Sequence, residues 1–472
     1  MQSAIADATR PTDTTRLEDL VYSLHQWGRS ELEEAWRTDN ANGRPTSATG
    51  GGRGSFFPEQ PTCITETGLT ESELEALILK LLFLRGNLSG HNISERIKLP
   101  FILVEPILWQ LTKDRLLAYS ESAPLNDHVY QLSEVGREQA RRMVEHCGYF
   151  GAAPVPLDIY LDSVQEQSIA EQHPTVADLH RAFADLLLPP QMLARLGPAI
   201  NSGRGFLLYG APGNGKTSIA ERVTHAFGDC IWIPRVLAID GQIIRLFDRL
   251  NHEEVPLDET SPSRGWARND QRWVRIRRPT IIAGGELTME NLEITFTTST
   301  GVGEAPLQLK SNCGTLVIDD FGRQRISIEQ LLNRWIVPLE KRYDFLSLAN
   351  GQKIQVAFDQ LIIFSTNLPS RELIHESFLR RIPYKIEVSD PSEEVFRTLL
   401  YRMCESLEIP CESWSIDYLI DQHYKAKGRP YRYCQPRDLL LQIRSYCLFH
   451  DVPMELTEEN IDLAVSNYFS DM

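Results

Sequence analysis

The spacing of apolar residues predicts alternating strands and helices over much of the second half of the chain. Short apolar runs bounded by glycine or polar residues predict buried strands at residues 206–209, 231–233, 315–318 and 360–367. Apolar residues at helical spacing follow the first run, from Ile219 to Ala226. Because strands and helices alternate here, we predict an α/β domain over residues 176–390, entered through a helical stretch at 176–196.

The pattern between residues 66 and 148 predicts a separate small module. Thr70 and Glu73 are spaced as a capping box for a helix that runs to Phe83. Further helices are expected around 93–97 and 107–115. Two short strands, 116–119 and 128–132, then bracket a turn, and a closing helix begins at Ser133. This order resembles a winged helix-turn-helix domain, which implies DNA binding.

The charges of this module favour a protein partner. Residues 66–145 carry twelve acidic and nine basic side chains, and the expected recognition helix, 100–111, is mostly apolar. Such a helix offers few groups that read base edges or bind phosphates. Docking to a protein is therefore our preferred interpretation, and DNA binding is the alternative.

Three other segments are predicted from composition and periodicity. Residues 1–65 are polar and contain a glycine-rich stretch, so we expect a largely disordered segment with one weak amphipathic helix at 17–36. Residues 149–175 are expected to be a linker. Residues 391–472 contain four helical patterns and predict a four-helix unit; the patterns cover 392–407, 416–427, 437–449 and 458–469.

A β-rich insertion is predicted at about residues 255–312, from alternating residues at 272–278, 292–296 and 307–309. Six arginines lie between Arg264 and Arg278, together with Trp266 and Trp273. They are interpreted as a solvated strand face or ion pairs between subunits, with contact to nucleic acid or an acidic partner as the alternative. A hairpin is predicted at 345–357, where Asn350 and Gly351 separate two alternating runs.

The residues after the first strand match the phosphate-loop spacing G-x-x-x-x-G-K-[ST]. Glycines allow backbone N–H groups to surround phosphate oxygens, and the helix that follows presents its positive end to the anion. Lys216 is expected to reach the β- and γ-phosphates, and the Thr217 hydroxyl to bind Mg²⁺. The predicted nucleotide-binding residues are Gly210, Ala211, Pro212, Gly213, Asn214, Gly215, Lys216, Thr217 and Ser218.

Polar residues also end two later strands. Asp319 and Asp320 follow the run 315–318, at the edge where open parallel sheets bind ligands, and Asn367 ends the run 360–367. We expect Asp319 to hold Mg²⁺ through water, and Asp320 to orient or deprotonate the attacking water.

Charge and cysteine content exclude some classes of protein. The net charge of −16 argues against bulk affinity for DNA. The eight cysteines show no metal-ligand spacing, so we expect reduced thiols and no structural metal. Since no signal peptide or membrane span is visible, a cytoplasmic protein without membrane insertion is expected.

Over residues 170–472 these motifs resemble the AAA+ ATPases. The resemblance implies an αβα core with a helical lid, and hydrolysis of ATP to ADP and phosphate with Mg²⁺. It makes Asp319 and Asp320 the Walker B pair and Asn367 sensor 1. Arg381, with Arg380 as the alternative, is similar to the arginine finger that reaches a neighbour's nucleotide, and Arg437 is similar to sensor 2. The second Walker B acid is more often Glu in this family.

The predicted hairpin at 345–357 resembles the pre-sensor-1 hairpin found in MoxR-type chaperones, McrB-type restriction motors and enhancer-binding activators. An arginine finger acting between subunits implies a homo-oligomer, with a hexameric ring expected. Our first hypothesis is an ATP-driven remodeller of a protein client. The alternatives are a DNA-associated ATPase or transcription regulator, and a nucleotide-gated scaffold with little turnover.

Overall fold

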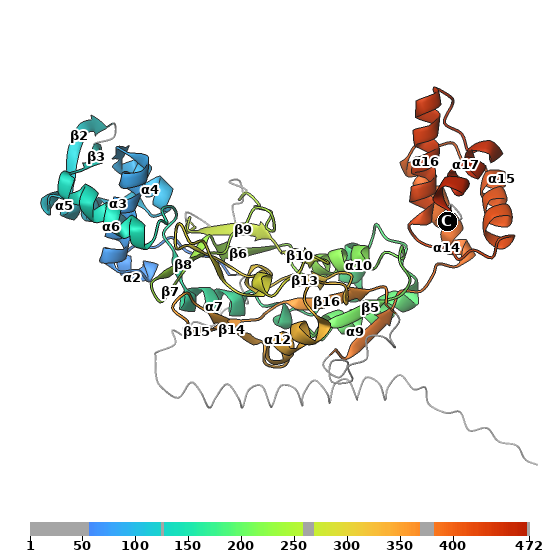
Figure 1. Ribbon diagram of the computed structural model, residues 1–472, viewed down its shortest axis with the longest axis horizontal. Coiled ribbons are helices and arrows are strands. Elements are labelled where there is room, and N and C mark those ends of the chain that lie inside the picture. The colour runs from blue at the N-terminus through green and yellow to red at the C-terminus, as the bar shows by residue number, and fades with distance from the viewer. Residues whose placement is uncertain (1–55, 124–126, 258–268, 369–381, 470–472) are drawn as a thin grey trace, which may run out of the picture. The chain divides into compact units, whose positions relative to one another are not determined.

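The computed structural model describes residues 56–123, 127–257, 269–368 and 382–469 (Figure 1). The chain divides into two compact units, and all described residues belong to the second, Ser55–Met472. Within these residues, no helix has both the length and the apolar character needed to cross a membrane.

A parallel sheet of five strands forms the centre of the α/β domain, with strand order β10-β13-β16-β5-β17. Its strands are β5 (Phe206–Tyr209), β10 (Thr280–Ala283), β13 (Thr315–Ile318), β16 (Leu361–Thr366) and β17 (Tyr384–Glu387). Strands β5, β13 and β16 were predicted from their apolar runs. Because β13 and β16 are neighbours and β16 also pairs with β5, the polar residues that end these strands meet at one edge of the sheet.

Helices cover this sheet with apolar side chains. Helices α8 (Val176–Ala182), α9 (Pro190–Asn201) and α10 (Lys216–Val223) share one hydrophobic core with β5 and β16. Helix α12 (Ile328–Lys341) contributes Trp335, which is fully buried, to a second core with β10, β13 and β16. The single helical stretch predicted at 176–196 is two helices, with Pro189 as the cap residue of α9.

The second predicted strand exists, but it does not belong to the central sheet. Strand β6 (Cys230–Pro234) pairs antiparallel with β9 (Trp273–Arg277), and β10 forms the edge of the central sheet instead. Strands outside the central sheet therefore occur both before and after β10 along the chain. The bounds of 255–312 predicted for the β-rich insertion are wrong. An apolar run shows that a strand is buried but not which strand is its partner.

A second, mixed sheet has the order β11-β12-β8-β7-β4. Its strands, together with β6 and β9, are called the added strands below. It consists of β4 (Val155–Pro156), β7 (Val236–Ile239), β8 (Gln242–Arg245), β11 (Thr295–Phe296) and β12 (Gly303–Glu304). The strand predicted at 307–309 is wrong, because Leu307–Lys310 forms the short helix α11. Gln308 of this helix is fully buried and donates a hydrogen bond to the Leu292 carbonyl at 2.7 Å.

The predicted hairpin is present as β14 (Tyr343–Ser347) and β15 (Lys353–Ala357). Its inward residues, including Leu346 and Val356, share a core with strands β6 to β9. The Gln352 amide also donates to Asp240, in the turn between β7 and β8, at 2.7 Å. The hairpin is thus packed against the added strands on one face and at its tip.

The expectation of a linker at 149–175 is wrong, because this segment contains helix α7 (Leu157–Glu166). Tyr160 of α7 is 1% exposed and packs in the core of the small sheets. Its hydroxyl donates to the Leu309 carbonyl at 3.3 Å and accepts from Asn312 at 2.9 Å. The helix therefore closes the hydrophobic core that the added strands share.

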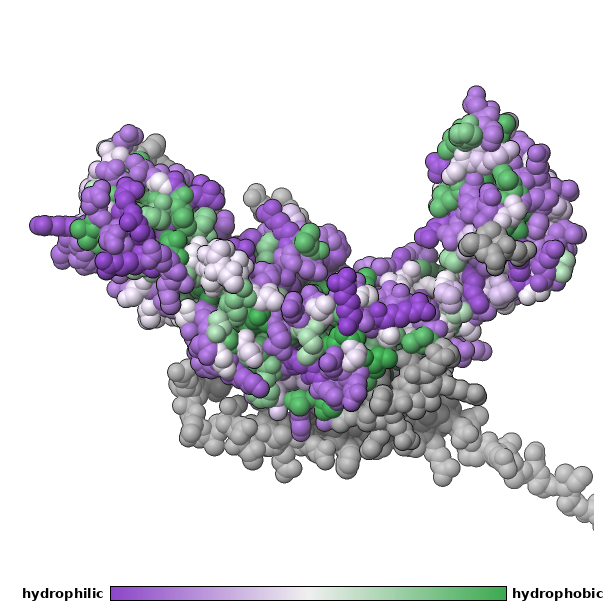
Figure 2. Space-filling model, in the orientation of Figure 1, coloured by the Kyte–Doolittle hydropathy of each residue, from purple (hydrophilic) through white to green (hydrophobic). Residues whose placement is uncertain are grey.

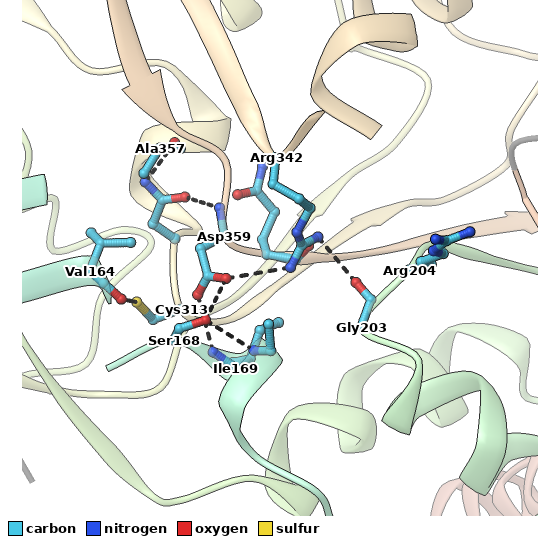
Figure 3. Close-up of polar contacts among 12 residues, drawn as sticks. Val164, Ser168, Ile169, Gly203, Arg204, Cys313, Arg342, Ala357 and Asp359 are labelled. Carbon is cyan, nitrogen blue, oxygen red and sulfur yellow. Dashed lines mark hydrogen bonds and ion pairs between the residues drawn. The ribbon is translucent and has the colours of Figure 1, made fainter. Parts of the chain in front are cut away.

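Asp359 fixes the end of this segment to the residue stretch before β16 (Figure 3). Its carboxylate accepts hydrogen bonds from the Ser168 hydroxyl at 2.8 Å and the Ile169 amide at 3.1 Å. Arg342 also reaches Asp359 at 3.4 Å and donates to the Gly203 carbonyl at 3.1 Å (Figure 3). The segment is consequently part of the folded domain.

The N-terminal module has the predicted order of longer elements, with one added short strand. It contains α3 (Glu71–Arg85), β1 (Leu88–Ser89), α4 (Gly90–Ile97), α5 (Phe101–Lys113), β2 (Leu117–Ala123), β3 (Asp127–Leu132) and α6 (Glu134–His146). The capping box of Thr70 and Glu73 is confirmed, with the two reciprocal hydrogen bonds at 2.8 and 3.3 Å. The third helix begins at Phe101, earlier than predicted, and Pro100 occupies its N-cap position without a side-chain hydrogen bond.

Residues 56–67 pack against the added strands, although disorder was expected up to residue 65. Phe56 contacts the ring of Trp273, and Phe57 contacts that of Trp232 edge-on. A short helix, α2 (Ile64–Thr67), follows. The amphipathic helix predicted at 17–36 lies outside the described residues.

The C-terminal residues form the four predicted helical stretches around a separate core. These are α14 (Glu393–Ser406), α15 (Ser413–Tyr418) continued by a π-helical stretch at Leu419–Lys425, α16 (Gln435–His450) and α17 (Glu458–Tyr468). Figure 2 shows hydrophobic residues gathered over α16, whose exposed side chains include Leu448 and Phe449.

Candidate functional site

The phosphate loop connects β5 to α10 as the sequence predicts. Gly213 and Gly215 have φ angles of +81° and +79°, a conformation that side chains rarely adopt. Gly210 lies so close to β17 and its extension that a Cβ atom there would be 2.4 Å from the Val388 carbonyl oxygen. Gly210 also has a positive φ, of +147°, so backbone conformation favours glycine at all three positions and close packing adds to this at Gly210.

Lys216 lies at the start of α10 with its ammonium over this loop. It donates hydrogen bonds to the carbonyl oxygens of Gly210 at 3.0 Å and Ala211 at 2.9 Å. A third bond, of 2.6 Å, joins it to Oδ1 of Asn367 at the end of β16. Burial lowers the pKa of Lys216, whereas the carboxylates of Asp319 and Asp320 act to raise this pKa.

Thr217 and Asp319 face each other between the start of α10 and the end of β13. The Thr217 hydroxyl donates to Oδ2 of Asp319 at 2.8 Å. Gln324 holds the backbone at this point, since its amide donates to the Asp319 carbonyl at 2.8 Å. The hydroxyl and carboxylate together form a pair of hard oxygen donors.

Asp320 and Asn367 complete the cluster. Asp320 has a φ of +48°, which Asp tolerates better than most residues. Its Oδ1 accepts a hydrogen bond of 2.8 Å from the Asn367 amide. Asn367 thus gives its oxygen to Lys216 and its N–H to Asp320, so that the residues predicted as Walker A, Walker B and sensor 1 form one connected group.

Asp390 and Arg432, which the sequence interpretation missed, support the phosphate loop. Asn214 donates to Oδ1 of Asp390 at 2.7 Å, and Arg432 forms an ion pair with the same carboxylate. The amide of Cys434 also donates to the Gly213 carbonyl at 2.9 Å. The residues before α16 therefore contact the phosphate loop.

The predicted arginines are not among the residues of this connected group that the structure describes. The Arg437 side chain is 66% exposed and pairs with neighbouring Asp438 at 3.3 Å, so it does not belong to the connected group. Arg380 and Arg381 lie outside the described residues. Pro212 lies exposed in the loop, and the Ser218 carbonyl accepts a bond of 3.1 Å from Arg222.

The arginine-rich stretch is largely structural where it is described. Arg272 is 2% exposed and pairs with Asp270 at 2.8 Å, while also donating to the Thr67 carbonyl. Arg278 is buried and bonds to the Gly228 carbonyl at 2.8 Å, and Arg277 pairs with Glu253. These contacts lie within the chain, whereas a solvated strand face or ion pairs between subunits was expected, with nucleic acid or an acidic partner as the alternative. Arg264 and Arg268 lie outside the described residues.

The donors present fit a magnesium nucleotide. Backbone N–H groups of a left-handed glycine loop and an adjacent lysine suit phosphate oxygens, and the Thr217 hydroxyl with the Asp319 carboxylate suits Mg²⁺. The described side chains contain no cluster of three or more His, Cys, Asp or Glu that could hold a metal ion by itself. The fold and the site together define an α/β protein with a phosphate-binding loop.

Comparison with known sequences gives short matches. Residues 392–467, which run from the start of α14 to the last turn of α17, match the family described as a domain of unknown function, DUF8689. The vesicular-fusion protein sec18 of Schizosaccharomyces pombe is 53% identical over 47 residues. This match spans 10% of the present chain and only 6% of the length of sec18.

Comparison with solved structures gives longer but more distant matches. NtrX from Brucella abortus has a TM-score of 0.38 at 14% identity, covering 62% of this chain and 61% of NtrX. A RuvB mutant of Thermotoga maritima has a TM-score of 0.37 at 11% identity, covering 61% of this chain and 72% of RuvB. Because these scores are low, the functional assignment rests on the residues of the site.

Proposed function

We propose that this chain is an AAA+ ATPase that hydrolyses ATP with Mg²⁺ and uses the energy to remodel a protein partner. One observation carries the proposal: Asn367 joins Lys216 to Asp320 at the strand edge where Thr217 meets Asp319. The strand order of the central sheet, with the loop strand β5 between β16 and β17, supports it.

Each residue has a role that follows from its position. The Lys216 ammonium exchanges its carbonyl partners for β- and γ-phosphate oxygens. Asp320 and Asn367, 2.8 Å apart, orient the attacking water, and Asp320 accepts its proton. A magnesium ion held by Thr217, and by Asp319 through water, would neutralise charge on the phosphates. Arg437 would approach the nucleotide from the helical unit.

Substitutions at Lys216 and at Asp320 should have different effects. Lys216→Ala should abolish ATP binding, because it removes the ammonium that pairs with the phosphates. Asp320→Asn should retain ATP binding and lower phosphate release by about a hundredfold, the size of a general-base contribution. Binding of a fluorescent ATP analogue and release of phosphate measure the two effects. Lys353→Ala, an exposed lysine on β15, is the matched control.

Equal loss of binding in Lys216→Ala and Asp320→Asn would contradict these roles. Ordinary multiple turnover by the unchanged chain would exclude the alternative of a scaffold with negligible hydrolysis. Since Asp320 is one methylene shorter than the more usual Glu, turnover is expected to be slow but measurable.

The N-terminal module is proposed to be a winged-helix domain that recruits a protein. The exposed side of α5 supports this choice, because Ile102 and Trp109 are 72% and 57% exposed, and Glu105 lies between them. An apolar surface with an acidic residue suits a protein better than a phosphate backbone. DNA recruitment remains the second candidate, supported by the order of helices and strands in the module.

Duplex DNA separates these candidates. We expect the full chain to show no measurable DNA binding across a salt series, and its ATP hydrolysis to be unchanged by DNA. Steep weakening of a measurable affinity with salt would instead indicate phosphate contacts. Fluorescence anisotropy of labelled duplex and phosphate release provide the two measurements.

A further inference from the structure

A cavity of about 940 Å³ lies between helices α3 and α6 of the N-terminal module and the hairpin β7–β8. Its walls are largely apolar and include Leu77, Met143, Tyr149 and Ile243. The volume falls in the range of small-molecule pockets, roughly 300–1,000 Å³. None of its lining residues belongs to the phosphate loop or to the ends of β13 and β16, so it is distinct from the nucleotide site.

Lys80 is the unusual member of this lining. It lies on α3 between the fully buried Leu79 and Leu81, and its own exposed fraction is 8%. Within the described part of the chain, no carboxylate pairs with its ammonium and no hydrogen bond engages it. Burial lowers the pKa of Lys80, whereas the electrostatic interaction with nearby Cys147 acts to raise this pKa. A lysine is seldom buried without a partner, since desolvating the charge is costly.

Exposed acidic side chains outnumber exposed basic ones in the lining. Glu73, Glu134 and Glu138 are exposed, and Arg142, which also lines the cavity and is exposed, donates a hydrogen bond of 3.3 Å to Glu138. This acidic excess disfavours polyanions such as nucleotides or nucleic acid. The apolar walls favour a carbon body, and the Lys80 ammonium favours one anionic group.

We propose that this cavity binds a small amphiphilic monoanion, an apolar carboxylic acid whose carboxylate pairs with Lys80. The hydrocarbon part lies against Leu77, Met143 and Ile243, so that the ligand contacts both the N-terminal module and the hairpin β7–β8. The site is independent of the ATPase assignment, because it requires neither nucleotide nor the residues around Lys216.

Calorimetric titration of the full chain with octanoate, and separately with neutral 1-octanol, tests the proposal. Octanoate should bind at one site and more tightly than octanol. Lys80→Met should weaken octanoate binding about tenfold, the size of one charge-assisted hydrogen bond, and leave octanol binding unchanged. Lys80→Arg should restore most of the affinity for octanoate. Lys113→Met, an exposed lysine on α5, should have no effect.

Val135→Trp provides a second test that does not depend on a buried substitution. Val135 lines the cavity and is 64% exposed, so a larger side chain can block the cavity without disturbing the core. Octanoate binding should be lost in this variant, whose circular dichroism should match that of the unchanged chain. Undetectable binding by the unchanged chain, equal affinities for octanoate and octanol, or unaltered binding in Lys80→Met and Val135→Trp would each overturn the proposal.

Discussion

Asn367 is the residue that joins the two charged halves of the site. Its amide side chain accepts from the Lys216 ammonium and donates to the Asp320 carboxylate at the same time. Lys216, Thr217, Asp319, Asp320 and Asn367 could be predicted from sequence because each directly follows a recognisable strand or loop. Asp390 and Arg432 could not, since an ion pair between residues so far apart leaves no local pattern.

Asp390 should matter for ATP binding although it is not expected to touch phosphate. Asp390→Ala removes the acceptor of Asn214 and the partner of Arg432, and so loosens the loop. We expect the Kd for ATP to rise about tenfold, as for loss of one hydrogen bond to a charged group. Asp417→Ala, which removes an exposed partner of Arg397, is the control. An unchanged Kd in Asp390→Ala would remove Asp390 from the site.

At the scale of elements, long apolar runs and distinctive turns were predictable, but pairing between distant strands was not. The run around Trp232 correctly indicated a strand but gave no information on its partner, which is β9. The hairpin at Asn350 was predicted from its turn. The hairpin β7–β8 was missed although Asp240 and Gly241, both with positive φ, carry the same kind of signal.

Asp127 should stabilise α4 in a pH-dependent way. Burial alone would raise the pKa of Asp127, but hydrogen bonds from His91, His128 and Gly90 hold this pKa below its ordinary value. A carboxyl with a lowered folded pKa stabilises the fold above its unfolded pKa, about 3.9, and this contribution is lost as pH falls through the folded pKa.

Asp127→Asn should therefore destabilise α4 by about 1–3 kcal/mol at neutral pH. The difference from the unchanged chain should shrink as the pH falls below about 4. Hydrogen exchange of peptides that cover Gly90–Ile97, followed by mass spectrometry, measures the local stability. Asp114→Asn, an exposed residue after α5, is the control, and equal exchange in both variants at neutral pH would refute the role.

At the scale of the whole molecule, separate hydrophobic cores stabilise different parts of the chain. The central sheet with its helices carries the site, the added strands with α7 form a second body, and α14 to α17 enclose a third. Sequence periodicity indicated the first and third because their elements are adjacent along the chain. The second is assembled from segments as distant as Tyr160 and Val356, which periodicity cannot connect.

A ring in which one subunit completes the site of its neighbour is proposed from the AAA+ resemblance, with Arg381 as the arginine from the adjacent subunit and Arg380 as the alternative. Mixing Arg381→Ala subunits with Asp320→Asn subunits tests it. Each variant alone should be nearly inactive, and mixtures should regain part of the ATP hydrolysis, because some interfaces then pair an intact Asp320 with an intact Arg381. Phosphate release across mixing ratios measures this, with an Arg380→Ala series for comparison. A strictly additive response, or a chain that stays monomeric in saturating ATP, would refute it.

The contact between Asp359 and Ser168 also bears on how the α/β domain can be isolated. A fragment cut at residue 176, where the sequence pattern first suggested a domain start, lacks Tyr160 and Val164 and so exposes apolar residues of the core to which they belong. Limited digestion would accordingly be expected to spare residues 157–171, and a soluble fragment that contains this domain has to begin before them.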